Sequence, residues 1–108
     1  MRAFLILTSF ILVLPSSFSE ASNYLSGQSL IDAVSGKSLT WFDGSKSYYG
    51  IDGTYIFTGK TKISGTWGVR GTWLCVAFSG GKEECARYFY NKGHLFAQNA
   101  VGKRFRAY

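Results

Sequence analysis

Residues that commonly perform catalysis are few in this chain, and their positions give them other roles. The single histidine, His94, follows Gly93 at a predicted turn, where we expect a solvated or capping imidazole. Glu83 and Glu84 are adjacent, and adjacent residues of a strand point to opposite faces, so they are not an acid–base pair. We therefore predict no catalytic residue, and a small hydrolase is the least favoured function.

The segment Gly36-Lys37-Ser38 has the residue types that end a phosphate-binding loop. However, Ile31 stands where the first glycine of such a loop is required, and a predicted helix precedes the segment instead of following it. We therefore expect no bound nucleotide and no cofactor.

The N-terminal segment has the pattern of a cleaved secretory signal peptide. Arg2 is followed by an apolar run over residues 3–14, which is shorter than the roughly 20 residues of a transmembrane helix. Pro15 and a small polar stretch come next, and we expect cleavage after Ala21, with Ser19 as the alternative. The pattern predicts a periplasmic or secreted protein that is not an integral membrane protein.

Cleavage after Ala21 leaves one small domain, residues 22–108, with sixteen aromatic side chains. Its eleven basic and five acidic residues give a net charge of +6, which attracts anionic partners without identifying them. Export disfavours nucleic acid, so the candidate partners are an anionic lipid, an acidic glycan and an acidic protein surface. A charge that only maintains solubility is the alternative.

Both cysteines, Cys75 and Cys85, lie in the predicted mature chain. Two thiols in an exported chain most simply form one disulfide. A metal site needs more ligands than these residues and His94 supply. We therefore predict a Cys75–Cys85 disulfide and no metal.

The mature chain begins with a predicted helix of about two turns within residues 25–37. Ser26 is the expected N-cap and Gly36 ends the helix. Short runs of strand-forming residues then alternate with turn signals such as Asp43-Gly44 and Asp52-Gly53, about every 8 to 12 residues. This pattern predicts a mainly β fold, an antiparallel meander of about six to eight strands that forms a barrel or a strongly curled sheet. The expected apolar face of the helix carries Leu30, Ile31 and Val34.

The spacing of the cysteines predicts the register of one hairpin. If Cys75 lies opposite Cys85, the loop is Ser79–Gly81, and such a three-residue loop with a glycine suits a bulged turn. Thr72 is then expected opposite Tyr88. The core face of the hairpin is predicted to carry Leu74, Val76, Phe78, Ala86, Tyr88 and Tyr90. The other face, apolar enough to be partly covered or to bind a partner, is predicted to carry Trp73, Cys75, Cys85, Arg87 and Phe89.

The tripeptide Gly-Thr-Trp occurs twice, at residues 65–67 and 71–73. A turn is predicted between the copies, so they belong to neighbouring strands. Trp67 is expected to be a structural residue of the core. The register places Trp73 on the face away from the core, beside Arg87, and these two residues are the candidate aromatic contact for a partner.

Six short segments together form a family pattern. They are Leu25 to Leu30, Gly36-Lys37-Ser38, Tyr49 with Asp52-Gly53, Gly65-Thr66-Trp67, Leu74-Cys75 and Cys85. With these segments the chain resembles a group of small exported bacterial domains of unknown function that are common in alphaproteobacteria. The resemblance covers nearly all of the mature chain, implies a small exported domain, and implies no activity.

Successive turns of a meander alternate between the two ends of the sheet. The predicted turns near residues 44, 60, 80 and 100 lie at the end away from the helix, where Asp43, Glu83 and Glu84 reduce the positive charge. The candidate anion-binding rim at this end, called the lysine rim below, consists of Lys46, Lys60, Lys62, Lys82 and Lys103. The basic character continues along one face of the last strand with Arg104 and Arg106.

These observations favour a noncatalytic exported binding module for an anionic envelope component or glycan. The alternative function is a secreted inhibitor of a hydrolase, or a host-directed interaction protein.

Overall fold

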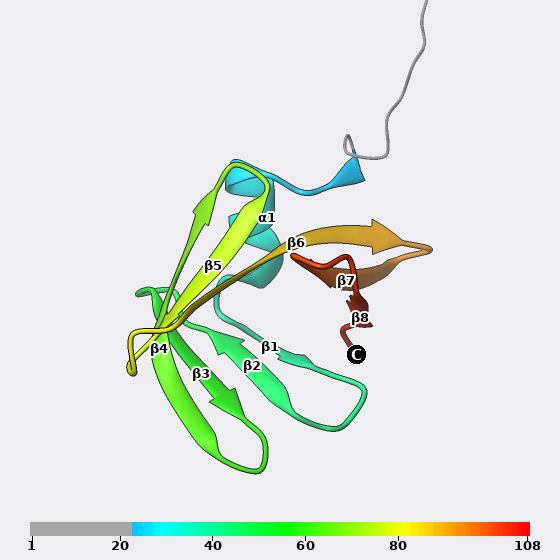
Figure 1. Cartoon of the computed structure of the whole chain (residues 1–108). Coiled ribbons are helices and arrows are strands. Elements are labelled where there is room, and N and C mark those ends of the chain that lie inside the picture. The colour runs from blue at the N-terminus through cyan, green and yellow to red at the C-terminus, as the bar shows by residue number, and fades with distance from the viewer. Residues whose placement is uncertain (1–22) are drawn as a thin grey trace, which may run out of the picture.

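The computed structural model describes residues 23–108, and the predicted signal peptide lies outside the described residues. One helix, α1 (Gly27–Val34), precedes eight strands that form a single antiparallel sheet in the order of the chain (Figure 1). The predicted antiparallel meander is therefore confirmed, and its eight strands are the upper limit of the predicted six to eight. The strands are β1 (Lys37–Thr40), β2 (Lys46–Tyr49), β3 (Thr54–Thr58), β4 (Lys62–Arg70), β5 (Trp73–Phe78), β6 (Glu83–Asn91), β7 (His94–Asn99) and β8 (Arg104–Arg106).

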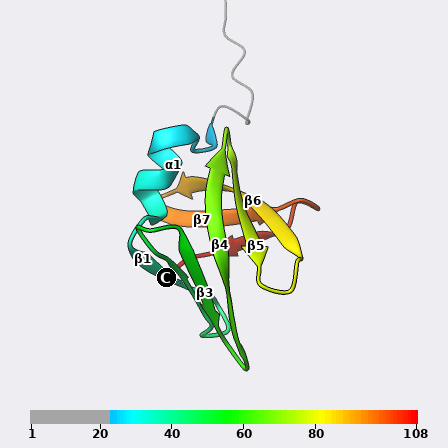
Figure 2. The same ribbon diagram turned by 90° about the vertical axis from the view of Figure 1, so that its left-hand side faces the viewer.

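The sheet curls into a half-barrel because its two longest strands change partners along their length. The first part of β4 pairs with β3 and the second part pairs with β5. In the same way, β6 pairs first with β5 and then with β7. Figure 2 shows the curled sheet, in which β6 and β7 run across the direction of β4.

Gly65 lies where β4 changes partners, opposite Tyr55 of β3 and Phe78 of β5. A Cβ atom at this position would collide with the backbone carbonyl oxygen of Ala77. The first glycine of the repeated Gly-Thr-Trp therefore permits a close backbone approach at a corner of the sheet.

The two edge strands meet at the C-terminus. The Tyr108 backbone N–H donates to the Thr40 carbonyl at 2.8 Å, which links the chain beyond β8 to β1. The Phe42 ring stacks on Phe105 with the ring centroids 6.4 Å apart. These two contacts join the edges of the half-barrel.

Helix α1 covers the end of the sheet at the β4–β5 turn, where the Gly27 N–H donates to the Gly71 carbonyl at 2.9 Å. The Ser26 N–H is capped by the Ser29 hydroxyl at 3.1 Å, and the helix ends before Gly36, whose φ is +74°. The residues of the helix that the structure buries are Leu30, Ala33 and Val34, whereas the predicted Ile31 is only half-buried.

The predicted core face of the β5–β6 hairpin is confirmed except at its end. Leu74, Val76 and Tyr88 are buried, and Phe78 and Ala86 pack against the core. The prediction is wrong for Tyr90, which is 53% exposed because the end of the β6–β7 hairpin extends beyond the core.

The predicted pairing of Thr72 with Tyr88 is also wrong. The β5–β6 ladder stops at the pair Trp73 and Arg87. The Tyr88 carbonyl instead accepts a hydrogen bond from the Leu25 backbone N–H at 2.8 Å. The segment before the helix thus takes the place that β5 leaves free.

The Cys75–Cys85 disulfide is formed, and the two residues lie directly opposite each other in the predicted register. The Phe78 N–H donates to the Lys82 carbonyl at 2.8 Å, so the loop is Ser79–Gly81 as expected. Gly81 has a φ of +95°, which a side chain would disfavour. Among residues 23–108, no helix is long and apolar enough to cross a membrane.

Candidate functional site

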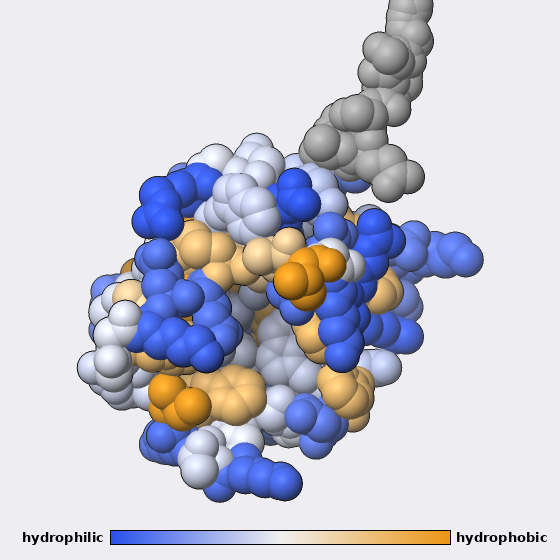
Figure 3. Space-filling view, in the orientation of Figure 1, coloured by the Kyte–Doolittle hydropathy of each residue, from blue (hydrophilic) through white to orange (hydrophobic). Residues whose placement is uncertain are grey.

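The concave face of the half-barrel encloses a cavity of about 920 Å³. In the space-filling view, apolar side chains lie around a hollow that hydrophilic ones border (Figure 3). The cavity is within the size range of small-molecule sites, and its walls are mainly apolar. The large side chains that line it are Trp41, Tyr49, Tyr55, Phe57, Ile63, Leu74, Val76, Phe78, Tyr88 and Phe105.

Four side-chain hydroxyls and one indole form hydrogen bonds in the wall of the cavity. The Trp41 indole donates to the Ser47 hydroxyl at 2.9 Å, and Ser47 shares a hydrogen bond of 2.9 Å with the Tyr55 hydroxyl. The hydroxyls of Tyr49 and Tyr88 share a hydrogen bond of 2.7 Å. These groups satisfy one another, as buried polar groups generally do.

Burial keeps the tyrosine hydroxyls of this wall neutral. It raises the pKa of Tyr49 and of Tyr88 well above the ordinary tyrosine value, and their closeness adds to the shift at Tyr49. The pKa of Tyr55 is raised for the same reason, while its hydrogen bond to Ser47 opposes the shift. These tyrosines therefore offer neutral donors and acceptors, whereas the carboxylates that line the cavity are those of Asp43, Glu83 and Glu84.

Exposed apolar side chains surround the mouth of the cavity at the end away from the helix. Phe42 in the β1–β2 turn is 71% exposed, and Val101 in the β7–β8 turn is 87% exposed. Ile63, at the beginning of β4, is 39% exposed. All three also line the cavity, so its apolar surface continues out to solvent.

The residues of the predicted lysine rim are exposed and belong to the turns or strand ends at this mouth. Lys82 lines the cavity and its Nζ lies 3.3 Å from Glu84 Oε2. The Lys103 Nζ lies 5.5 Å from the centre of the Phe105 ring. Hydrogen bonds from the hydroxyl and backbone N–H of Ser45 lower the pKa of Asp43, so this carboxylate at the mouth is ionised.

The two predicted arginines of β8 do not join the lysine rim. Arg104 and Arg106 lie on the convex face, together with the predicted pair Trp73 and Arg87. Pairing across the strands connects them: Trp73 lies opposite Arg87, Arg87 opposite Gln98, and Gln98 opposite Arg104. The structure therefore separates the predicted site residues into a lysine group at the mouth and an arginine group on the convex face.

The arginines of the convex face lie against aromatic rings. Arg87 is held between Tyr24 and Trp73, with its guanidinium carbon 4.3 and 4.6 Å from the two ring centres. Arg104 lies 4.8 Å from the centre of the Phe89 ring, which stacks in turn on Phe96. The apolar outer face of the hairpin is thus partly covered, which was one of the two alternatives from the sequence, and Tyr24 is the covering residue that the sequence did not indicate.

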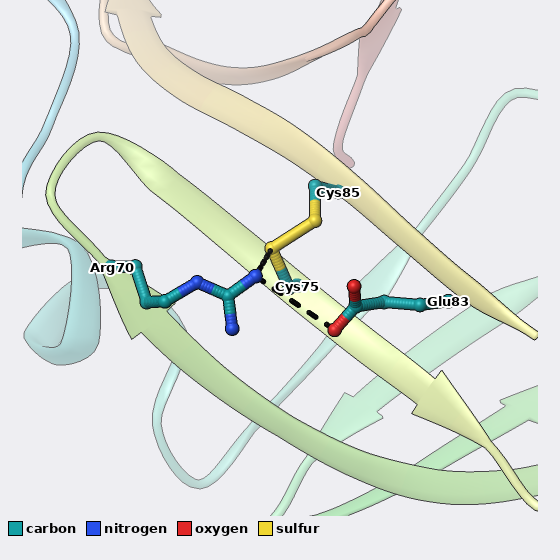
Figure 4. The surroundings of a disulfide bond; sticks show 4 residues. All are labelled: Arg70, Cys75, Glu83 and Cys85. Carbon is teal, nitrogen blue, oxygen red and sulfur yellow. Dashed lines mark hydrogen bonds and ion pairs between the residues drawn. A yellow bond between two sulfur atoms is a disulfide. The ribbon is translucent and has the colours of Figure 1, made fainter.

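One cluster in the described part of the chain has the residue types of a metal site. It consists of Cys75, Cys85 and Glu83. Both sulfur atoms are joined in the disulfide, so they are not free to ligate an ion. Figure 4 shows that Arg70 occupies the space beside them: its Nη2 donates to Cys75 Sγ at 3.3 Å and lies 3.8 Å from Glu83 Oε2.

No protein-family model, no curated protein and no solved structure matches this chain. The resemblance to small exported alphaproteobacterial domains therefore stays a prediction. The disulfide fits an exported protein, because such bonds persist in oxidising compartments.

The sequence did not indicate the cavity or its hydroxyl wall. A signal was present in β2, where Ser47 and Tyr49 alternate with exposed residues, and in β3, where Tyr55 lies between two half-buried residues. Alternation places these three side chains on one face. The partner of Tyr49 is Tyr88, thirty-nine residues further along the chain, and no local pattern connects the two.

Proposed function

We propose that this protein is an exported, noncatalytic binding module that holds the apolar part of an anionic amphiphile, such as an envelope lipid, in its concave cavity. The observation that carries the proposal is the mainly apolar cavity of about 920 Å³ whose mouth lies at the end of the sheet that carries the lysine rim. Lys82 of the rim lines the cavity, together with the carboxylates of Asp43, Glu83 and Glu84. The lysine rim then lies where the anionic head group of the ligand emerges.

The hydrophobic effect favours an apolar ligand in this cavity. Aromatic and aliphatic side chains line it, and covering such surface contributes about 25 cal/mol for each Å² removed from water. The hydrogen-bonded hydroxyls of the wall already have partners, so an acyl chain beside them does not leave these hydroxyls unsatisfied.

The surroundings of the mouth suit contact with a membrane that contains anionic lipid. Phe42, Ile63 and Val101 are exposed there and continue the apolar lining. Lysines beside apolar side chains keep their charge in water while their stems lie along apolar surface, and near an anionic membrane each contributes about 1 kcal/mol. We propose that the ligand enters and leaves the cavity through this end.

A fluorescent fatty acid with a free carboxylate provides the direct test. The double variant Lys60→Glu/Lys62→Glu reverses two lysines of the rim for which the structure shows no ion pair within residues 23–108. The matched control is Lys37→Glu/Lys92→Glu, which makes the same change in net charge at the helix end of the sheet. We expect wild type and control to bind, the rim variant to bind more weakly at low salt, and the difference to shrink as salt rises.

The cavity itself is tested by filling it. Ala86 lines the cavity, whereas Ala77 is exposed and belongs to the opposite face of the hairpin. A folded Ala86→Phe variant is expected to lose fatty-acid binding, and Ala77→Phe is expected to keep it. Equal binding by both folded variants would refute the cavity as the site.

The alternative function, an inhibitor or another protein-binding factor, gives a different result in the same experiments. Wild type would then bind neither fatty acid nor anionic vesicles, and would instead copurify with one protein at fixed stoichiometry.

A further inference from the structure

A second and smaller pocket lies on the convex face, away from the cavity of the proposed function. Its volume is about 220 Å³, and most of its exposed lining is polar. This is below the range for drug-sized ligands, so it accommodates a single ring-sized group. The residues that line it are Asn23, Tyr24, Phe89, Tyr90, Asn91 and Arg104.

Arg104 is the charged group of this pocket, and its side chain is held in place from two sides. The Nε atom donates to the Gln98 side-chain oxygen at 3.0 Å, and the guanidinium lies over the Phe89 ring. Within residues 23–108 no carboxylate forms an ion pair with Arg104. A guanidinium presents its donors in a planar fork that matches a carboxylate. The two terminal nitrogens of Arg104 form no hydrogen bond with the residues that the structure describes.

The charge around the pocket is positive, and no acidic side chain of residues 23–108 forms an ion pair with it. In the described part of the chain, the ion pairs are Arg70 with Glu83 and Lys82 with Glu84. Arg87 and Arg106 therefore also lack an acidic partner there. Arg87 is two strands from Arg104 in one row across the sheet, a separation of about 10 Å.

Aromatic contacts hold these neighbouring guanidiniums as well. Arg87 lies between Tyr24 and Trp73, and Arg106 lies 4.6 Å from the centre of the Tyr108 ring. The Nε atoms of Arg87 and Arg106 are buried without a hydrogen-bond partner in the protein. Three arginines that form no ion pair within the described part of the chain are thus fixed on one surface. Such a surface suits a ligand whose negative charges repeat along a chain.

We infer that this pocket binds a carboxylate-bearing sugar residue of an acidic glycan. Arg104 pairs with the carboxylate through its fork, and the side-chain amides of Asn23 and Asn91 provide donors and acceptors for sugar hydroxyls. Further acidic sugar residues extend toward Arg87. The amides and the small size of the pocket favour a sugar acid over an acyl chain, which the larger cavity suits.

The test is a titration of the full mature protein with a short oligomer of galacturonic acid at low salt. The neutral galactose oligomer of the same length is the control ligand. Loss of a charge-assisted bidentate contact is expected to weaken binding of the acidic oligomer at least about tenfold in Arg104→Gln. Arg104→Lys keeps the charge and loses the fork, so it is expected to recover only part of the affinity.

Lys92→Gln is the matched control, since it removes a neighbouring charge that neither lines the pocket nor belongs to the lysine rim. It is expected to bind the acidic oligomer like wild type. Binding of the fluorescent fatty acid by Arg104→Gln should be unchanged, which shows that the fold is intact and separates this site from the cavity.

The inference is overturned if wild type does not bind the acidic oligomer, if the neutral oligomer binds equally well, or if Arg104→Gln binds like wild type. It is also overturned if inorganic phosphate displaces the oligomer at an equal concentration, because the pocket then recognises a small anion and not a sugar acid. A failure of fatty-acid binding in every variant overturns the proposed function and leaves this site in place.

Discussion

The two faces of the sheet are formed by the same strands but differ in chemistry. On the concave face, tyrosine hydroxyls are paired with one another and are kept neutral by burial, and the lysines lie at the mouth. On the convex face, arginines of β6 and β8 lie against aromatic rings. Because successive residues of a strand alternate between faces, one sequence provides a mainly apolar container and a cationic surface.

The two tryptophans of the repeated Gly-Thr-Trp, which spans nine residues, show this difference between the faces. Trp67 lies on the concave side, where its indole donates to the Gly50 carbonyl at 2.9 Å and its ring packs edge-on against Tyr49. Trp73 lies on the convex side against Arg87. The same tripeptide therefore has a core role in one copy and a surface role in the other, because the turn between them shifts the alternation.

The largest effect is expected from Trp67→Ala. This change removes core packing and one of the two hydrogen bonds that the Gly50 carbonyl accepts, the other coming from the Gly53 N–H. The free energy of unfolding should therefore fall by about 3 kcal/mol or more. Urea denaturation followed by circular dichroism measures the loss. An unchanged melting temperature would show that the concave tryptophan is no more structural than the convex one.

Removal of the disulfide is expected to lower the free energy of unfolding nearly as much. Cys75 and Cys85 close a short loop across β5 and β6, which stabilises the folded chain by about 3 kcal/mol in the chain-entropy model. The double variant Cys75→Ser/Cys85→Ser should unfold at a lower urea concentration by this amount. Intact mass with and without reductant checks the pairing in protein exported to the periplasm, where two free thiols would refute it.

Alkaline pH should weaken the concave face through Tyr49 and Tyr88. Their pKa values are raised in the folded state, so the unfolded chain loses these protons first, and stability is complete below about pH 10 and falls above it. The expected slope is about 1.4 kcal/mol per tyrosine for each pH unit above 10. Urea denaturation at pH 9 and pH 11 measures it.

A Tyr88→Phe variant serves as the control for that slope. It should lose part of the pH dependence, because one of the two groups no longer titrates in the unfolded chain. Tyr90→Phe is matched in chemistry, and since Tyr90 is exposed, it should keep the full slope.

The smallest effect is expected from Trp73→Ala. The variant loses one of the two rings that hold Arg87, and an exposed cation–π contact is worth about 0.5–1 kcal/mol. The free energy of unfolding should therefore fall by about 1 kcal/mol, and fatty-acid binding should not change. A loss as large as that of Trp67→Ala would remove the distinction between the two faces.

The order of the strands and one hairpin could be predicted because local chemistry determines them. Asp-Gly and Gly-Gly steps mark turns, and the spacing of Cys75 and Cys85 gives the register and the Ser79–Gly81 loop. Alternation then assigns most residues of β5 and β6 to the correct face. The errors at Thr72 and Tyr90 occur at the ends of this ladder, where the local pattern no longer decides the partner.

The site residues could be predicted only in part, as the placement of the basic residues shows. In any meander, successive turns lie at alternate ends of the sheet. The positions of the turns in the sequence therefore placed the lysines of the rim at one end. It did not separate Arg104 and Arg106 from them, because the separation depends on which face of β8 is convex.

By itself, then, the sequence determined the meander, the disulfide and the positions of the turns, since each follows from residues close to one another in the chain. Only the tertiary structure decided the cavity, the Tyr49–Tyr88 hydrogen bond and the covering of Arg87 by Tyr24. The physical reason is curvature. The partner changes along β4 and β6 bend the sheet, and this bend brings together side chains that are distant in the chain.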